Sequence, residues 1–313
     1  MPDPQAAESP KPRSIGFVGL GNMGIPMARR LAAAGYAVHG YDVSSDARRR
    51  ASDAGVAVVS SLGEAAASDL VILMLPSSAI VSLVLDDAEF IASIRPGTLV
   101  VDMGSSEPGA TRTASDQLAR RSGRLLDAPV SGGVGGAEAG RLTIMVGGSA
   151  DDLNEARPLL ECLGRTVHAG PIGAGDAVKA LNNLLSAAHL WVTSEAMLVG
   201  QRFGIEPQVL LDVFNSSSGR SGSTENKWPN FILPGTFDSG FALQLMLKDM
   251  RIATQLARDC GVPSRLGEAA VSLWSEASSS LDAGADHTEV ALYLQEAAGP
   301  PADQADHQAG GST

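Results

Sequence analysis

The spacing of apolar residues predicts two halves of different architecture. In the first half, short apolar runs alternate with amphipathic stretches, which is typical of an α/β protein with a doubly wound, mostly parallel sheet. The apolar runs predict strands over residues 14–18, 36–41, 56–59, 69–75, 98–103, 124–128, 142–147 and 166–169. The amphipathic stretches predict helices over residues 25–34, 45–54, 62–67, 80–85, 108–121 and 151–162.

The second half carries only helical periodicity. It predicts helices over residues 175–201, 207–216, 241–260, 263–280 and 288–298. The first and longest is mostly apolar, but Lys179, His189 and Glu195 interrupt it, so we expect a buried core helix and not a membrane span. His189 is accordingly interpreted as a hydrogen-bonded core residue. The pattern divides the chain into a disordered tail (1–13), an α/β domain (14–172), an all-α domain with a long first helix (173–298) and a second disordered tail (299–313).

Composition narrows the classes of function. The chain has 313 residues, 44% of them apolar, and a formal net charge of −12, which indicates a globular protein with a sizeable core and no general nucleic-acid surface. Its basic run, Arg48–Arg50, lies between Asp46 and Asp53 and is interpreted as a solvated helix face. The five histidines show no ligand spacing, so no metal site is expected.

The two cysteines and the N-terminus bear on the compartment. Cys162 and Cys260 match no metal or redox spacing and are too few for a disulfide scaffold. We therefore expect two buried thiols in a reducing compartment, the cytoplasm. The polar N-terminus lacks the apolar stretch of a signal peptide, so none is expected.

A glycine-rich turn joins the first predicted strand to the first predicted helix. It consists of Gly19, Leu20, Gly21, Asn22, Met23 and Gly24. In such a turn, Gly19 permits the tight bend, Gly21 lets a pyrophosphate approach the backbone, and Gly24 allows the helix to pack closely on the strand. An ordinary strand-to-helix turn is the alternative, but the flanking elements favour a Rossmann dinucleotide site.

The residue that ends the second predicted strand bears on the choice of cofactor. Asp42 can accept hydrogen bonds from the adenosine ribose hydroxyls, and its charge repels the 2′-phosphate of NADP, so NAD is expected. Arg48–Arg50 keep NADP possible. Two further strands end in Leu75-Pro76 and Gly104-Ser105, and ligands of open α/β sheets bind at such carboxyl ends. Leu75, Pro76 and Ser105 are therefore predicted to contact the cofactor.

A polar face at the start of the long helix is the candidate for proton transfer. Lys179, Asn182 and Asn183 fall at i, i+3 and i+4, which places them on one side of the helix. Hydride transfer to nicotinamide needs a group that takes the hydroxyl proton, and a lysine can do so when burial lowers its pKa from about 10.4. A surface lysine is the alternative for Lys179. Asn183 can bond substrate oxygens, whereas Asn182 could equally cap or bond locally.

Two other segments could bind substrate or cofactor. The segment 127–133 leaves a strand and exposes the hydroxyl of Ser131 followed by the amides of Gly132 and Gly133, a run that suits a carboxylate. The glycine-dense stretch 131–140 is predicted to be a loop, and a merely flexible loop is the alternative. Lys248 lies in an apolar helical stretch and could reach cofactor or substrate, although a Lys-Asp pair more often marks a polar edge of a helix.

Together these motifs resemble the β-hydroxyacid dehydrogenase family, which includes 3-hydroxyisobutyrate dehydrogenase and the larger 6-phosphogluconate dehydrogenase. The resemblance extends over residues 15–298 and rests on four segments in order, residues 16–27, 127–133, 173–183 and 247–249. It implies a Rossmann domain followed by a helical domain, and a homodimer or homotetramer formed through the helical domain. By motif match it implies that Lys179 is the general acid/base and that Ser131, Gly132 and Gly133 bind the substrate carboxylate. It also implies that Asn183 positions the substrate and that Lys248 lies over the cofactor cleft.

Two segments depart from the family pattern. Gly104 stands where the family often has serine, which puts the contact of that residue with the cofactor in doubt. The segment 215–228 corresponds to a region that borders the substrate pocket in the family, and its residues do not assign it to the hydroxyisobutyrate branch. Arg220 or Lys227 in this segment could bind a second anionic group, or could be plain surface charge.

The sequence therefore predicts an NAD-dependent oxidoreductase that interconverts a small 3-hydroxy acid and its semialdehyde or 3-oxo acid. One alternative is an NADPH-dependent reductase of glyoxylate-type, succinic semialdehyde-type or imine substrates, although imine reducers of this architecture generally lack the lysine. The other is a non-catalytic dinucleotide-binding module. A 6-phosphogluconate enzyme is disfavoured because the helical half is short.

Overall fold

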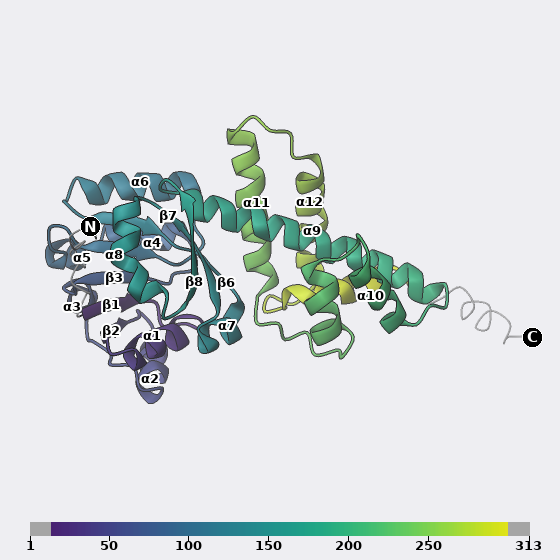
Figure 1. Ribbon diagram of the computed structural model, residues 1–313, viewed down its shortest axis with the longest axis horizontal. Helices are drawn as coiled ribbons and strands as arrows, with labels where there is room; N and C mark the ends of the chain where they lie inside the picture. The colour runs from purple at the N-terminus through teal and green to yellow at the C-terminus, as the bar shows by residue number, and fades with distance from the viewer. Residues whose placement is uncertain (1–13, 300–313) are drawn as a thin grey trace, which may run out of the picture. The chain divides into compact units, whose positions relative to one another are not determined.

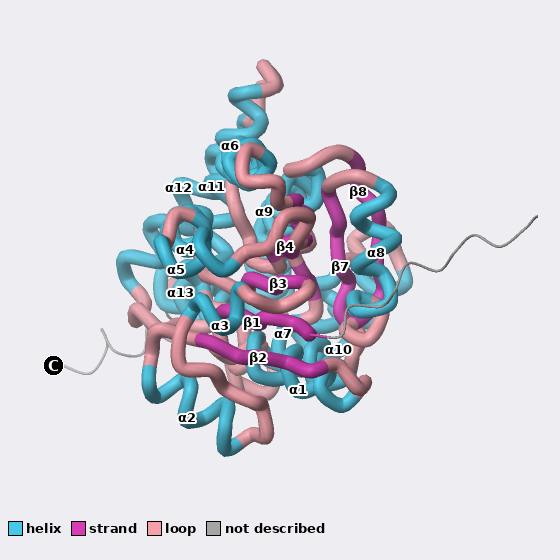
Figure 2. Tube along the Cα trace, turned by 90° about the vertical axis from the view of Figure 1, so that its left-hand side faces the viewer, coloured by secondary structure: helices cyan, strands magenta, loops and turns pink. Residues whose placement is uncertain are grey.

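A single eight-stranded sheet forms the centre of the first of two compact units. The computed structural model describes residues 14–299, and the units divide after Lys179. The strands are β1 (Ser14–Val18), β2 (Ala37–Tyr41), β3 (Leu70–Leu73), β4 (Leu99–Asp102), β5 (Arg124–Asp127), β6 (Val130–Ser131), β7 (Leu142–Gly147) and β8 (Gly164–Gly170). Their order is β2-β1-β3-β4-β5-β7-β6, with β8 also paired to β7, and Figure 2 shows β2, β1, β3 and β4 in succession.

The direction of the strands confirms a mostly parallel, doubly wound sheet. The five strands from β2 to β5 are mutually parallel, whereas β7 runs antiparallel to β5 and β6. Helices connect the strands, with α6 and α8 lying alongside the sheet (Figure 1). The helices of this unit are α1 (Gly24–Ala33), α2 (Ser45–Asp53), α3 (Leu62–Ala66), α4 (Ser78–Leu85), α5 (Ala88–Ser93), α6 (Pro108–Ala119), α7 (Gly133–Ala139) and α8 (Ala150–Leu160).

Apolar side chains cover both faces of the sheet. Along β3, Leu70 and Ile72 belong to one buried cluster, while Val71 and Leu73 belong to another. This alternation follows from the two-residue period of a strand, and it explains why the central strands read as unbroken apolar runs.

Two local predictions in this unit are wrong. Residues 56–59 form no strand, because only a single bridge joins Gly40 and Val58. The expected glycine loop at 131–140 begins with the last residue of the short strand β6 and contains the helix α7. Ala137 is fully buried in this helix, so tertiary packing overrides the low helix propensity of the glycines.

The second unit is all-helical, as predicted. It contains most of α9 (Ala174–Arg202), then α10 (Pro207–Ser216), the π-helix η1 (Ser223–Ile232), α11 (Leu243–Asp259), α12 (Arg265–Ser280), the 3₁₀ turn η2 (His287–Glu289) and α13 (Val290–Ala297). Within this unit α11 and α12 lie side by side (Figure 1). Its core includes Trp191, whose ring centroid lies 6.4 Å from that of Trp274 and 6.1 Å from that of Tyr293.

Three residues are more exposed than the sequence indicated. His189 lies on the exposed side of α9, so its interpretation as a core residue is wrong. Cys260 is exposed and Cys162 only partly buried, so the two thiols are not both core groups; both are free. His189 lies on the side of α9 that does not pack against the core, and Cys260 lies at the exposed C-terminal end of α11.

Several predictions concern ends of the chain or absences. The expected tails, apart from Gly299, lie outside the described residues. Within residues 14–299, none of the helices combines the length and apolarity needed to cross a bilayer. The same part of the chain contains no cluster of His, Cys, Asp and Glu suited to a metal ion.

Candidate active site

The glycine turn after β1 is shaped by close backbone contacts. Gly19 has φ of +101°, and a Cβ there would lie 2.3 Å from the carbonyl oxygen of Met74. A Cβ on Gly24 would lie 1.9 Å from the carbonyl oxygen of Gly19. At Gly21, by contrast, a Cβ would meet no atom of the described chain within 4 Å. Gly19 and Gly24 thus serve the fold, while the backbone of Gly21 is open to a ligand.

The N-terminus of α1 offers amide donors at this turn. Its N-cap is Met23, whose side chain makes no capping hydrogen bond, and its first turn carries no acidic residue. The first amides of a helix have no partner within the helix and favour anions. Because α1 begins at the open glycine backbone, this end suits a pyrophosphate.

Asp42 is held against the glycine turn. Its Oδ2 accepts a hydrogen bond from the amide of Leu20 at 2.8 Å, and its Oδ1 accepts one from Ser44 at 2.8 Å. The nearby Arg48 donates to the carbonyl oxygens of Asp42 and Val43 and lies over the ring of Tyr41, 5.7 Å from its centroid. The carboxylate therefore has a fixed position beside the turn, with acceptor capacity left for ribose hydroxyls.

The loops after β3 and β4 meet the glycine turn at the carboxyl edge of the sheet. A Cβ on Gly19 would lie 3.3 Å from the Leu75 side chain, and a Cβ on Gly104 would lie 2.6 Å from the carbonyl oxygen of Leu75. Gly104 therefore permits the loops that carry Pro76 and Ser105 to approach each other. This contact gives a structural reason for the departure from the family's serine.

Three buried aspartates surround the start of α9. The sequence motifs assign no role to two of them, Asp102 and Asp176. Asp127 accepts from the amides of Gly173 at 2.7 Å and Asp176 at 2.9 Å. Asp176 accepts from the Ser106 amide at 3.1 Å and the Thr111 hydroxyl at 2.7 Å. Asp102 accepts from the Ser106 hydroxyl at 3.0 Å. These bonds hold the first turn of α9 to the carboxyl ends of β4 and β5.

The crowding of carboxyl groups changes their protonation. Burial, followed by the charges of Asp102 and Asp127, raises the pKa of Asp176 well above its ordinary value, against the hydrogen bonds from Thr111 and Ser106. Burial also raises the pKa of Asp127, although amides of Gly173 and Asp176 oppose this shift. The cluster thus favours retention of a proton.

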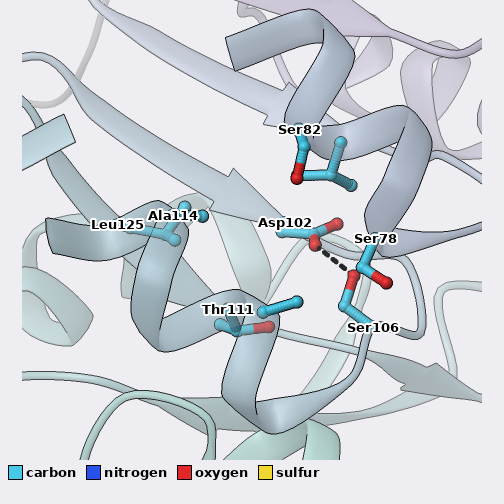
Figure 3. A pocket seen from close by; sticks show the side chains of 9 residues that line it. Ser78, Ser82, Asp102, Ser106, Thr111, Ala114 and Leu125 are labelled. Carbon is cyan, nitrogen blue, oxygen red and sulfur yellow. Dashed lines mark hydrogen bonds between the residues drawn. The ribbon is translucent and has the colours of Figure 1, made fainter. Parts of the chain in front are cut away.

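A small cavity with a mixed polar and apolar lining adjoins this cluster (Figure 3). Its volume of about 10 Å³ leaves room for about one water molecule, so it is too small for a dinucleotide or a hydroxy acid. Its lining includes Ser78, Ser82, Asp102, Ser106 and Thr111.

Lys179 follows Asp176 by three residues and is buried, with 8% of its surface exposed. The alternative of a surface lysine is therefore wrong. Asn183, one turn further along α9, is buried at 5% exposed and donates from Nδ2 to Asp249 Oδ2 at 2.6 Å. Asn182 is exposed and donates to Asn183 Oδ1 at 3.2 Å, which is the local bonding left open by the sequence.

Lys248 and Asp249 lie on α11 with different exposures. The Lys248 amine is 3.5 Å from Asp249 Oδ1, and 26% of its side chain is exposed, against 2% for Asp249. Asp249 therefore bonds both Asn183 and Lys248. The Lys-Asp pair is not a simple polar edge, and Asp249 was missed because its partner lies 66 residues away.

Ser131 ends β6, Gly132 is the N-cap of α7, and Gly133 is the first residue of that helix. Ser131 pairs with Thr143 of β7, while Gly132 and Gly133 have φ of +133° and +61°. Gly132 caps α7 without a side-chain hydrogen bond. The segment begins at Asp127, which also anchors α9, so the two motifs are linked through one carboxylate.

Comparison with known proteins covers both units. A model of the NAD binding domain of 6-phosphogluconate dehydrogenase matches residues 14–173, and a model of the NAD-binding part of NADP-dependent 3-hydroxyisobutyrate dehydrogenase matches residues 173–294. The NAD-dependent L-serine dehydrogenase of Pseudomonas aeruginosa is 41% identical over 84% of this chain and 91% of its own. The 2-(hydroxymethyl)glutarate dehydrogenase of Eubacterium barkeri is 38% identical over 80% of this chain and 84% of its own.

A solved structure gives the same result. Mycobacterium tuberculosis 3-hydroxyisobutyrate dehydrogenase with L-serine is 34% identical, with a TM-score of 0.84 over 90% of this chain and 99% of that one. Its agreement with the family models confirms the predicted fold and the NAD(P) cofactor. On this evidence the chain belongs to the β-hydroxyacid dehydrogenase family of NAD(P)-dependent oxidoreductases.

Proposed function

We propose that this chain oxidises a small 3-hydroxy acid to its semialdehyde or 3-oxo acid, with NAD as the hydride acceptor and Lys179 as the general acid/base. The observation that carries the proposal is the burial of Lys179 on a helix whose first turn is fixed by Asp127 and Asp176. A general base must be positioned before its pKa matters, and these bonds provide the positioning.

The cofactor site is proposed to lie at the glycine turn. The open backbone at Gly21 and the uncapped start of α1 suit a pyrophosphate, and the fixed carboxylate of Asp42 suits a ribose diol. NAD, when bound, accepts a hydride from the carbon that bears the hydroxyl. The turn residues from Gly19 to Gly24, Leu75, Pro76, Ser105 and Lys248 are proposed as further contacts.

Proton transfer and substrate orientation are assigned to α9. Neutral Lys179 accepts the hydroxyl proton as the hydride leaves, and returns it in the reverse direction. Asn183 uses one amide hydrogen for Asp249, and its second is proposed to bond the substrate oxygen. Asp249 thereby acts as a positioning residue for Asn183.

The substrate carboxylate is proposed to bind at Ser131, Gly132 and Gly133. A hydroxyl followed by amides at a turn provides several donors for one carboxylate. The compounds named for the relatives, L-serine, 3-hydroxyisobutyrate and 2-(hydroxymethyl)glutarate, all carry a hydroxyl on the carbon β to a carboxylate. This shared group favours 3-hydroxy acids as the substrate class.

We also propose how the chain is organised and where it works. Residues 14–172 would hold the cofactor, and residues 173–298 would hold the substrate and associate with other copies. Leu185, Val192 and Val199 lie seven residues apart on α9 and are 60%, 56% and 70% exposed, which supports a homodimer or homotetramer. The free thiols support a reducing compartment such as the cytoplasm.

A spectrophotometric panel of small 3-hydroxy acids and their semialdehydes, run in parallel with NAD and NADP, tests the proposal. We expect oxidation of at least one 3-hydroxy acid with NAD. A preference for NADP above tenfold, about 1.4 kcal/mol, would contradict the role of Asp42. Tight NAD binding without turnover of any hydroxy acid would instead indicate a non-catalytic module.

A further inference from the structure

Lys227 is a positively charged residue whose hydrogen-bond acceptors on α9 are neutral groups. It lies on the π-helix η1, is partly buried, and donates from Nζ to the Ser186 hydroxyl at 2.6 Å, with the Ser186 carbonyl oxygen at 3.5 Å. Among residues 14–299, no carboxylate forms a salt bridge with it. The other cation of this segment, Arg220, pairs with Glu225 at 2.7 Å, and both are well exposed.

Ser186 places this cation on the face of α9 that carries the proposed catalytic groups. It follows Lys179 by seven residues and Asn183 by three, so the three lie on one side of the helix. At roughly 1.5 Å per residue, Ser186 is about 10 Å beyond Lys179 along the axis. Because the lysine side chain is flexible, its amine can move from Ser186 toward a substrate bound at Lys179.

The electrostatic surroundings leave the ammonium group short of negative charge. Burial lowers the pKa of Lys227 to about 8, and the more distant Asp286 opposes this shift. Asp286 already accepts from Ser239, Gly240, Phe241 and Thr288. Burial lowers the pKa of His287, and the charge of Lys227 lowers it further, while the bond to Asp286 opposes. An anion at Lys227 would therefore offset an existing desolvation cost.

The irregular helix supports a functional role for this position. π-Helical turns are rare and occur frequently at functional sites. The described part of η1 also contains two buried polar atoms without a hydrogen-bond partner, Ser223 Oγ and Trp228 Nε1. Each of these buried atoms carries the desolvation cost of a missing hydrogen bond.

We propose that Lys227 binds a second anionic group of the substrate, so that the enzyme prefers a 3-hydroxy dicarboxylate to the corresponding monocarboxylate. This inference rests on the proposed function of the same site. Lys227 is a specificity-determining residue here, since hydride and proton transfer are assigned to other groups.

The pH dependence of KM distinguishes this role from a structural one. As pH rises through about 8, Lys227 in the free enzyme loses its proton, and the attraction for the second carboxylate is lost. KM for the dicarboxylate should then rise, while KM for the monocarboxylate should not follow. Asp286 and His287 are the titratable neighbours of Lys227, and they act on both substrates alike.

The test compares 2-(hydroxymethyl)glutarate with 3-hydroxyisobutyrate, using NAD and the full chain. Lys227→Met removes the charge, Lys227→Arg keeps it at all working pH values, and Arg220→Met is the matched control. We expect Lys227→Met to raise KM for the dicarboxylate at least tenfold with kcat within about threefold, and to leave the monocarboxylate within about twofold. Lys227→Arg should restore the low KM and remove its rise near pH 8.

Two results would overturn the inference. One is a loss of similar size for both substrates in Lys227→Met, and the other is a wild-type preference for the monocarboxylate. Calorimetric binding of glutarate and butyrate to the NAD complex separates the inference from the proposed function. If neither hydroxy acid is oxidised but glutarate binding still depends on Lys227, the proposed reaction is contradicted and the anion site is supported. If glutarate binds equally well to wild type and to Lys227→Met, the anion site itself is contradicted.

Discussion

At the scale of single residues, the buried carboxyl of Asp176 connects the first turn of α9 to the loop and helix that follow β4. Its oxygens bond Ser106 and Thr111, and the charges of Asp102 and Asp127 lie nearby. The raised pKa of Asp176 means that the folded state holds a proton that the unfolded state releases above about pH 4. Its contribution to stability is therefore fully present below that pH and declines as pH rises toward the folded pKa.

Replacing this carboxyl with an amide should change how stability depends on pH. Asp176→Asn can still accept from the Ser106 amide and donate to Thr111, whose own proton can go to the Glu107 carbonyl. We expect the variant to gain stability over wild type from about pH 4 upward, by at most about 1.4 kcal/mol per pH unit, until the native carboxyl ionises.

Denaturant unfolding across pH measures this difference. Asp46→Asn is the matched control, because Asp46 is 72% exposed and pairs only at the surface. Parallel pH curves for wild type and Asp176→Asn would show that Asp176 ionises normally in the fold.

At the scale of elements, the loops after β3 and β4 approach each other closely because Gly104 lacks a side chain. The family often has a serine at this position. Gly104→Ser places a Cβ against the Leu75 carbonyl oxygen, at 2.6 Å without movement. We expect a loss of about 1–3 kcal/mol in the free energy of unfolding and a raised KM for NAD, because the loops must separate. Gly109→Ser, where a Cβ meets nothing within 4 Å, should leave KM for NAD unchanged. Equal effects of the two variants would exclude the contact as the cause.

The elements also show how far the sequence determines the fold. Local patterns predicted β1, α1 and β2 correctly, since strand period, glycine turn and glycine C-cap are all local signals. They missed α7 and η1, whose helical form depends on packing against distant residues. In the candidate site, motif spacing predicts Lys179 and Asn183, but it assigns no role to Asp176 and Asp249, whose hydrogen-bond partners lie 65 and 66 residues away. No local pattern encodes such contacts.

At the scale of the whole molecule, Leu185, Val192 and Val199 form an exposed apolar stripe on α9. Such a stripe lowers solubility unless a partner surface covers it. Its residues repeat every seven positions, as in helices that pair along a seam. Val192→Glu should therefore convert the proposed oligomer to monomer, as measured by light scattering with size-exclusion chromatography. Leu266→Glu, at a leucine that is 87% exposed on α12, is the control and should not change the mass. A wild-type monomer, or an unchanged mass for Val192→Glu, would contradict the proposal.

The central claim is that Lys179 transfers the proton and does little to bind the cofactor. The most direct measurement is kcat and the NAD dissociation constant of Lys179→Ala, beside Asn182→Ala as an exposed control on the same helix. We predict that Lys179→Ala lowers kcat by about 10²–10⁴-fold and leaves NAD affinity within about twofold, while Asn182→Ala retains turnover. Retained turnover in Lys179→Ala, or a loss explained entirely by weaker NAD binding, would contradict the account.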